Sequence, residues 1–159
     1  MEPERFLDPL DFLRELHDHD LRYLLVGRQA MVLLGAPLLS SDYDFYLSPE
    51  AEDLETMLSL AKDLDLEVSP RDPGRRPFFS LLSATLKLDF FRSRSYSIPG
   101  GETFTFEEVF GRRRVIPVEG FSVYVPTLRD LIRTKMVRGL PKDLEDIKYL
   151  EALLERGEG

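Results

Sequence analysis

The chain has 159 residues, of which 43% are hydrophobic and 31% are charged, and its formal net charge is −8. This length predicts one domain, 1–159, with a core at about 20–126 and C-terminal helices at about 127–156. The absence of cysteine excludes disulfides and thiolate metal sites, and the net negative charge argues against general DNA binding. No apolar run is long enough to span a membrane, and the acidic start lacks the features of a signal peptide, so we expect a cytoplasmic protein.

The first elements are predicted by a helix cap and by an apolar run. Asp8 followed by Pro9 predicts a helix that ends near Asp18. The apolar segment 23–26 predicts a buried strand, and Gly27 directly after it allows a sharp turn into a helix. Because a helix start presents free N–H groups and glycine permits a close approach, this turn is a candidate phosphate site.

Two aspartates begin the next predicted strand. Side chains alternate along an extended chain, so Asp42 and Asp44 share one face, while Tyr43, Phe45 and Leu47 share the other and can enter a core. Two neighbouring carboxylates repel each other, and a hard divalent cation is the usual partner that makes such a pair tolerable. The pair is therefore a candidate magnesium or manganese site.

The central part of the chain predicts a helix, a loop and a hairpin. Ser48-Pro49 predicts the start of an amphipathic helix, whose expected apolar stripe is Leu54, Met57, Leu58, Ala61 and Leu64. After a short strand near 66–68, the segment 69–77 contains prolines, glycine and three arginines, and we expect a mobile loop. Segments 78–82 and 85–91 predict a hairpin whose second strand presents Asp89.

The C-terminal part predicts a second hairpin and two helices. We expect a loop at 95–101, a helical turn at 104–110, and a hairpin formed by 112–118 and 121–125. Thr127 and Asp130 resemble a capping box that opens a helix to about Arg138. Pro141 starts the last helix, and its predicted buried stripe is Leu144, Ile147, Leu150, Leu153 and Leu154.

Charge is segregated along the chain. Residues 1–70 carry 5 basic and 16 acidic side chains, whereas 71–94 carry 6 and 2, and 112–138 carry 7 and 2. If the two basic segments fold beside the aspartate pair, they would attract nucleotide phosphates or RNA. The alternative is that they are ordinary solvated loops and helix faces.

The glycine turn, the helix after it and the Asp-x-Asp strand together resemble the nucleotidyltransferase superfamily, which has the polymerase β-like fold. Asp89 matches the position of that family's third metal ligand, and 127–146 is similar to the C-terminal helices of small bacterial members, including abortive-infection type toxins. The resemblance covers about residues 20–155. It implies an α+β fold with a nucleotidyltransferase-like mixed β-sheet, packed helices and a C-terminal helical pair.

The resemblance also implies a catalytic site. Asp42, Asp44 and Asp89 would be the catalytic carboxylates that hold Mg²⁺ or Mn²⁺, with Asp89 nearest the attacking hydroxyl. The positions expected to bind the nucleotide are Gly27, Arg28, Ser41, Lys135 and Asp143. For Lys135 and Asp143 the alternative is an ordinary pair on a helix surface.

Two positions depart from the family's pattern. Arg28 stands where the family usually has glycine or serine, and the loop 35–41 lacks the basic residue that many small relatives carry. If the chain is an active enzyme, Arg28 should extend toward the triphosphate. If the chain is catalytically silent, Arg28 should fill the pocket.

The resemblance implies that the chain moves a nucleoside monophosphate from a nucleoside triphosphate to a hydroxyl of RNA, a protein or a small molecule. A toxin–antitoxin role with an antitoxin-like partner would fit the toxin likeness. The alternative is a catalytically silent module that binds a nucleotide, an RNA or a partner protein. The three acids favour an enzyme, because clustered carboxylates are costly to keep without a cation.

Overall fold

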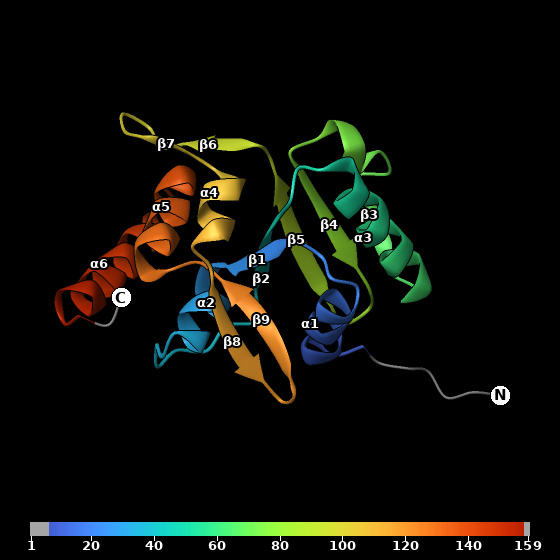
Figure 1. Ribbon diagram of the computed structural model, residues 1–159, viewed down its shortest axis with the longest axis horizontal. Helices are drawn as coiled ribbons and strands as arrows, with labels where there is room; N and C mark the ends of the chain where they lie inside the picture. Colours follow the sequence, from blue (N-terminus) through green and yellow to red (C-terminus); the bar gives the residue numbers. More distant parts are fainter. Residues whose placement is uncertain (1–6, 158–159) are drawn as a thin grey trace.

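The computed structural model describes residues 7–157 of the chain, which form an α+β fold (Figure 1). In chain order the elements are α1 (Pro9–Asp18), β1 (Tyr23–Val26), α2 (Gly27–Leu33), β2 (Tyr43–Leu47), α3 (Ala51–Asp63), β3 (Glu67–Ser69), the 3₁₀ turn η1 (Pro73–Arg75), β4 (Phe78–Leu82), β5 (Lys87–Arg92), β6 (Ser95–Ser97), β7 (Thr103–Thr105), α4 (Phe106–Gly111), β8 (Arg114–Val118), β9 (Phe121–Val125), α5 (Leu128–Arg138) and α6 (Pro141–Glu155).

The central sheet has five strands in the order β1-β2-β5-β4-β3. Strands β2 and β5 are parallel, and the other neighbouring pairs are antiparallel, so the expected mixed sheet is confirmed. The chain leaves β2 through α3 and returns by the β3, β4, β5 meander, which places β5 between β4 and β2. This order makes Asp44 of β2 the direct neighbour of Asp89 of β5.

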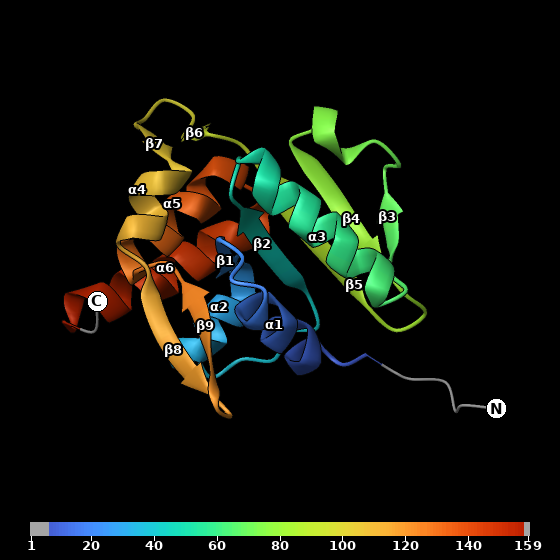
Figure 2. The same ribbon diagram turned by 45° about the vertical axis from the view of Figure 1, so that its right-hand side comes forward.

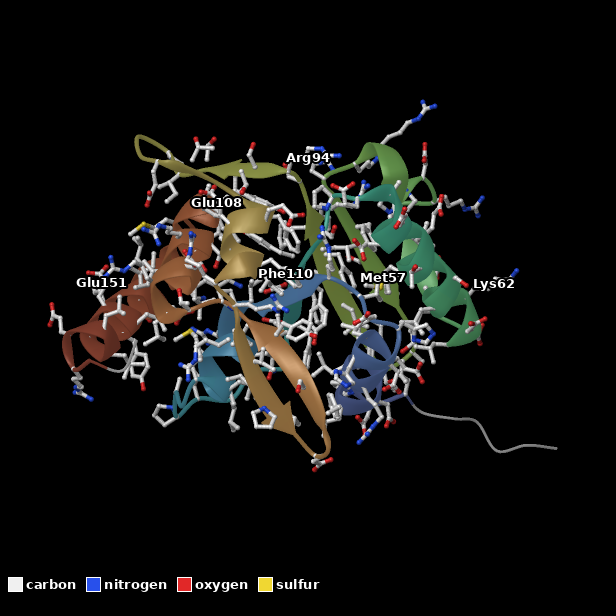
Figure 3. All side chains as sticks on the ribbon, viewed as in Figure 1. Met57, Lys62, Arg94, Glu108, Phe110 and Glu151 are labelled. Carbon is white, nitrogen blue, oxygen red and sulfur yellow. The ribbon has the colours of Figure 1, made fainter. Side chains whose placement is uncertain are left out.

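One face of this sheet forms the core. Phe45, Phe90 and Phe79 are paired across β2, β5 and β4, and each is fully buried. The ring centroids of Phe45 and Phe90 are 4.8 Å apart, and those of Phe90 and Phe79 are 5.0 Å apart. Phe12 of α1 packs on Phe45 and Phe90. The ribbon of α3 runs along the sheet (Figure 2), and its Met57 is fully buried (Figure 3). Helices α1 and α3 therefore cover this face, as alternation along β2 predicts.

The remaining helices lie toward the other side of the molecule. Helix α2 contacts β1, β2 and α5, and α5 packs along α6 as the predicted C-terminal pair. Figure 1 shows α5 and α6 side by side, away from α1 and α3. Strand β9 of the β8–β9 hairpin packs on β1 and α1. No helix between residues 7 and 157 has the length and apolarity that crossing a membrane requires.

Three boundary predictions were wrong. Helix α3 begins at Ala51 because Ser48 is buried in a turn before it, where its hydroxyl accepts a 3.2 Å hydrogen bond from the Glu50 N–H. The predicted loop 69–77 contains η1. The predicted loop at 95–101 begins with β6, which pairs with β7 in a hairpin that the sequence pattern did not reveal.

Two predictions about the C-terminal helices were also wrong in part. Thr127 caps α5 by accepting a 3.1 Å hydrogen bond from the Asp130 N–H, but the Asp130 carboxylate accepts from Arg112 and Arg133 instead of completing a capping box. Leu144, predicted to be buried, is 56% exposed. Helix α6 instead turns Asp143 and Asp146 inward, together with three apolar residues, Ile147, Leu150 and Leu153.

Candidate functional site

Asp44 and Asp89 lie side by side on one face of the central sheet, and the buried phenylalanines of the core lie on the opposite face. Asp44 and Asp89 are register partners on the parallel strands β2 and β5, and Ser80 is the partner of Asp89 on β4. Directly paired residues of adjacent strands point to the same face. The Ser80 hydroxyl donates a 2.6 Å hydrogen bond to Asp89 Oδ1, which orients this carboxylate. Asp42 is exposed and precedes β2 by one residue.

Gly27 brings the start of α2 against Asp44. It follows β1 directly and has a φ of +66°, a conformation that favours glycine. A Cβ atom at this position would lie 2.9 Å from Asp44 Oδ2. The sharp turn expected at this glycine is confirmed, because the left-handed backbone favours glycine, and the absence of a side chain lets the Asp44 carboxylate approach closely.

Negative charge is only partly balanced at Asp44. Burial raises the pKa of Asp44, and the neighbouring Asp89 and Asp42 carboxylates raise it further. Arg138 and Lys142 lower this pKa without reversing the shift. The nearest cation is Arg138, whose Nη1 lies 3.8 Å from Asp44 Oδ2. This site would therefore favour an additional positive charge.

A chain of buried and partly buried ion pairs connects the site to α6. Asp146 Oδ2 lies 3.2 Å from Arg28 Nε and 2.9 Å from Lys135 Nζ. Lys135 Nζ is also 3.8 Å from Asp143 Oδ1, and this same oxygen accepts a 2.6 Å hydrogen bond from Arg138 Nη2. Lys135 is only 3% exposed, and Asp143 is fully buried. The two acids of α6 thus hold cations of α2 and α5 near Asp44.

The pair formed by Arg138 and Asp143 is ionised at neutral pH. Burial alone would raise the pKa of Asp143, but hydrogen bonds from the Arg138 side chain and the Leu140 N–H hold that pKa below its usual value. The hydrogen bond to Asp143 also raises the pKa of Arg138. Asp143 therefore acts on the site by orienting Arg138.

Two cavities meet at Asp44 and Arg138, which line both of them. The polar cavity has a volume of about 300 Å³ and is also lined by Arg28, Asp42 and Lys142. The second, which we call the aromatic cavity, has a volume of about 240 Å³ and is also lined by Gly27 and by Tyr46, Phe91, Tyr96, Thr134, Lys135 and Val137. A ligand in one cavity would therefore lie next to a ligand in the other.

The structure brings most of the predicted site residues to these cavities, with three exceptions. Asp89 lines neither cavity, although it is the neighbour of Asp44. Ser41 is exposed and lines neither. Asp143 lies behind Arg138 instead of facing a cavity.

Arg28 does not fill the pocket, and its extension toward a triphosphate stays a prediction. Its guanidinium turns toward Asp146, donating bonds of 3.2 and 3.4 Å to the two carboxylate oxygens, and it stands in the wall of the polar cavity without filling it. In the loop 35–41, which lacks a basic residue, Leu39 is 96% exposed.

Several residues at the site were missed by sequence reasoning. Arg138 lies three positions after the predicted Lys135, and Asp146 lies three positions after the predicted Asp143. Residues three apart lie on the same face of a helix, so this spacing could have identified both missed residues. Lys142 lies one residue into the last predicted helix. Tyr96 carried no usable signal, because the hairpin that holds it was not predicted.

The predicted basic wall beside the acids is supported only in part. Arg112 and Arg133 both pair with Asp130, and Arg113 lies over the Phe110 ring at 4.0 Å from its centroid. Segment 112–138 contributes Lys135 and Arg138 to the two cavities. From segment 71–94, Lys87 approaches the other acid, with its Nζ 4.0 Å from Asp89 Oδ2.

The donor chemistry at Asp44 and Asp89 suits a hard divalent cation, since carboxylate oxygens are the ligands that Mg²⁺ prefers. Asp42 adds its charge near Asp44. Within residues 7–157, however, no three His, Asp or Glu side chains are grouped closely enough to hold a metal ion. The residue types therefore fit a divalent cation. Their arrangement between residues 7 and 157 provides two adjacent carboxylates, Asp44 and Asp89, and no third acid close enough to complete the site.

Neither models of known protein families nor curated protein sequences match this chain. Solved structures do match its fold. A proposed nucleotidyltransferase from Thermotoga maritima has a TM-score of 0.62 and 16% identity, with 92% of each chain covered. The lincosamide antibiotic adenylyltransferase LnuA, with lincomycin bound, has a TM-score of 0.62 and 15% identity, with 91% of this chain and 95% of LnuA covered.

A third structure agrees with these two. An antigenic nucleotidyltransferase-like protein from Paracoccidioides brasiliensis has a TM-score of 0.52 and 16% identity, covering 89% of this chain and 72% of that protein. At such identities the likeness shows the fold alone. The chain thus has the nucleotidyltransferase fold that the sequence motifs indicated.

Proposed function

We propose that this chain, which has the nucleotidyltransferase fold, transfers a nucleoside monophosphate from a nucleoside triphosphate to a hydroxyl acceptor with the help of Mg²⁺ or Mn²⁺. The observation that carries the proposal is the pairing of Asp44 with Asp89 beside the Gly27 turn. Asp42 stands in the wall of the same polar cavity. These are the residue types that nucleotidyl transfer requires, on the fold that commonly performs it.

The polar cavity would hold the triphosphate. Arg28, Arg138 and Lys142 present positive charge to it. Gly27 lines the neighbouring aromatic cavity, where the absence of a side chain leaves the start of α2 close to Asp44. Lys135 and Asp143 contribute by holding this group of cations together.

Asp44 and Asp89, the adjacent pair on β2 and β5, would hold the metal ion, and Asp42 would add its negative charge beside Asp44. When bound, the ion supplies positive charge to the oxygens of the phosphate being transferred. Asp89 would lie nearest the attacking hydroxyl and could accept its proton, with Ser80 keeping the carboxylate in place.

The acceptor could be RNA, a protein or a small molecule, as the resemblance left open. A small molecule is supported by the fold likeness to an adenylyltransferase with bound lincomycin. The toxin–antitoxin role stays a prediction, which a small antitoxin-like gene beside this one would favour.

A second candidate function is a silent binding module. The specific observation in its favour is that Arg138 approaches Asp44 while no three acids within residues 7–157 are grouped to hold an ion. Such a module would bind the nucleotide through Arg28, Arg138 and Lys142 without transferring it.

The test is transfer of label from nucleoside triphosphates labelled at the α-phosphate, with Mg²⁺ or Mn²⁺ and with RNA, protein or small hydroxyl compounds as acceptors. We expect the wild-type chain to label one class of acceptor and Asp44→Asn to lose at least about 100-fold in rate. The reason is that metal assistance contributes several kcal/mol and each 1.36 kcal/mol changes a rate tenfold.

Glu55→Gln is the matched control, because Glu55 is an exposed acid on α3, away from the cavities. Undiminished transfer by Asp44→Asn would contradict the metal mechanism. Nucleotide binding by the wild type without transfer to any acceptor class would favour the silent module.

A further inference from the structure

The aromatic cavity lies directly beside the proposed reaction centre. One wall of the cavity is formed by β2 and β5, on the same face of the sheet that carries Asp44 and Asp89. Tyr46 and Phe91 are register partners two residues beyond these aspartates, so they point to the same face. Helix α5 closes the cavity from the other side with Thr134 and Val137.

Three aromatic rings shape this cavity. The ring centroids of Tyr46 and Tyr96 are 4.3 Å apart in a stacked pair, and those of Tyr46 and Phe91 are 5.9 Å apart. Phe104 extends the stack behind Tyr96, which keeps the β6–β7 hairpin in place. Such rings are held rigidly and present flat apolar surface to a ligand.

The polar groups of α5 that line this cavity are already engaged. The Thr134 hydroxyl donates a 2.7 Å hydrogen bond to the Leu131 carbonyl, and the Lys135 ammonium contacts Asp146 and Asp143. Charge therefore reaches this cavity mainly through Asp44 and Arg138, at its boundary with the polar cavity. Away from that boundary the rest of the lining is apolar except for the hydroxyls of Tyr46 and Tyr96, and the buried Tyr96 hydroxyl has no hydrogen-bond partner among the described residues. A ligand bound here would therefore be largely apolar and could meet a polar group at Tyr96.

The volume of this cavity limits the size of its ligand. A cavity of about 240 Å³ lies at or below the lower end of the range of roughly 300–1,000 Å³ usual for ligand sites. It can hold a compact ring system, but it cannot hold a stretch of polynucleotide.

We propose, resting on the function proposed above, that the aromatic cavity binds a compact and largely apolar ring of a substrate, with the reacting group at Asp44. Two sources share this chemistry, the base of the donor nucleotide and the ring of a small hydroxylated acceptor. In both cases Tyr46, Phe91 and Tyr96 select the ring, and the polar cavity takes the phosphates.

The experiment uses the full chain and benzyl alcohol, a compact ring that carries a hydroxyl, and it measures binding by saturation-transfer NMR and titration. We expect Val137→Phe to weaken binding at least about tenfold, because the larger side chain fills the cavity from α5. Val115→Phe is the matched control, since Val115 is 52% exposed on β8. Equal binding by Val137→Phe and the control would overturn the proposal.

A second variant keeps the test valid if Val137→Phe does not fold. Phe91→Leu removes one aromatic wall with a small change of volume, and we expect weaker binding while circular dichroism and melting stay close to wild type. Unchanged binding by this folded variant would also count against the aromatic cavity.

Competition distinguishes the two sources. If Mn²⁺ and ATP displace benzyl alcohol, the ring is the donor's base, and if ATP and benzyl alcohol bind together, the ring belongs to the acceptor. Inorganic tripolyphosphate has no ring, so displacement by tripolyphosphate would overturn the proposal in favour of an anion site.

The proposed function can fail separately. Benzyl alcohol binding that Val137→Phe abolishes, without label transfer to any acceptor, would leave the ring site standing and remove the transferase. Label transfer combined with unchanged benzyl alcohol binding by Val137→Phe would leave the transferase and remove the ring site.

Discussion

Gly27 joins β1 to α2 in a left-handed backbone conformation, with a φ of +66°. A Cβ atom added there would lie 2.9 Å from Asp44 Oδ2, and this carboxylate oxygen could move aside at the expense of the site geometry. A side chain at position 27 would therefore lower stability through the strained backbone. It would also displace the Asp44 carboxylate from its position in the site.

We expect Gly27→Ala to lower the free energy of unfolding by about 1–2 kcal/mol, the cost of the left-handed conformation for an L-residue. Gly111→Ala is the control, because Gly111 has open space around its Cβ position and no positive φ. Urea unfolding of both variants measures the difference, and equal stability of the two would show that the turn relaxes.

The raised pKa of Asp44 makes a prediction about pH. Burial and the neighbouring acids make the folded chain hold this proton more tightly than the unfolded chain does. The contribution of Asp44 to stability is therefore full below the ordinary carboxyl pKa of about 3.9 and is lost as pH rises through the folded pKa.

Without metal, we expect Asp44→Asn to melt at a higher temperature than the wild type at neutral pH, because it removes an unfavourable buried charge. The gain should shrink as pH falls from neutral through the raised pKa of Asp44, because the aspartate then becomes protonated. Melting curves across this pH range measure the effect, with Glu55→Gln as the control. A lower melting temperature for Asp44→Asn at pH 7 would show that the contact with Arg138 outweighs burial.

At the scale of elements, α6 is oriented by charge. Its inward stripe contains Asp143 and Asp146, which pair with cations of α2 and α5, while Leu144 is left 56% exposed. A buried carboxylate with good partners is tolerated, whereas a buried cation that has lost its partner is not.

We expect Asp146→Asn to cost roughly 3 kcal/mol of unfolding free energy, because it leaves Lys135 buried with Asp143 as its remaining partner, 3.8 Å away. Leu144→Ala should cost about 0.5 kcal/mol or less, as is usual for exposed positions. Guanidinium or urea unfolding compares the two. The apolar stripe deduced from sequence predicts the reverse order, so a larger cost for Leu144→Ala would restore that interpretation.

At the scale of the whole molecule, tyrosines distributed over the fold limit its stability in alkali. Burial raises the pKa of Tyr43, but three others are shifted further. Burial raises the pKa values of Tyr23 on β1, Tyr46 on β2 and Tyr96 on β6. The unfolded chain releases phenolic protons near pH 10, whereas the folded chain retains them. Stability is thus unaffected below about pH 10 and falls as pH rises above it.

We expect the melting temperature to fall steeply above about pH 10, with each of these tyrosines contributing up to about 1.4 kcal/mol per pH unit. Tyr46→Phe should make the fall less steep, because it removes one of the three groups. Tyr149→Phe serves as the control, since Tyr149 is 36% exposed. Identical alkaline profiles for the two variants would contradict the prediction.

Some features of this chain were predictable from neighbouring residues alone. Alternation along 42–47 placed Phe45 in the core and Asp44 on the opposite face, and an apolar run ending at Gly27 marked the junction of strand and helix. Local patterns suffice here because the direction of a side chain in a strand and the allowed φ of a residue depend only on the adjoining backbone.

Tertiary structure decided the features that depend on distant partners. The parallel register of β2 and β5 sets Asp44 beside Asp89, and the β6–β7 hairpin carries Tyr96 onto Tyr46. The burial of Asp146 depends on Arg28, which precedes it by 118 residues. The sequence itself determined which carboxylates, aromatic rings and cations are present. Folding decided which of them meet, because a charged or aromatic side chain becomes buried only where another part of the chain supplies its partner.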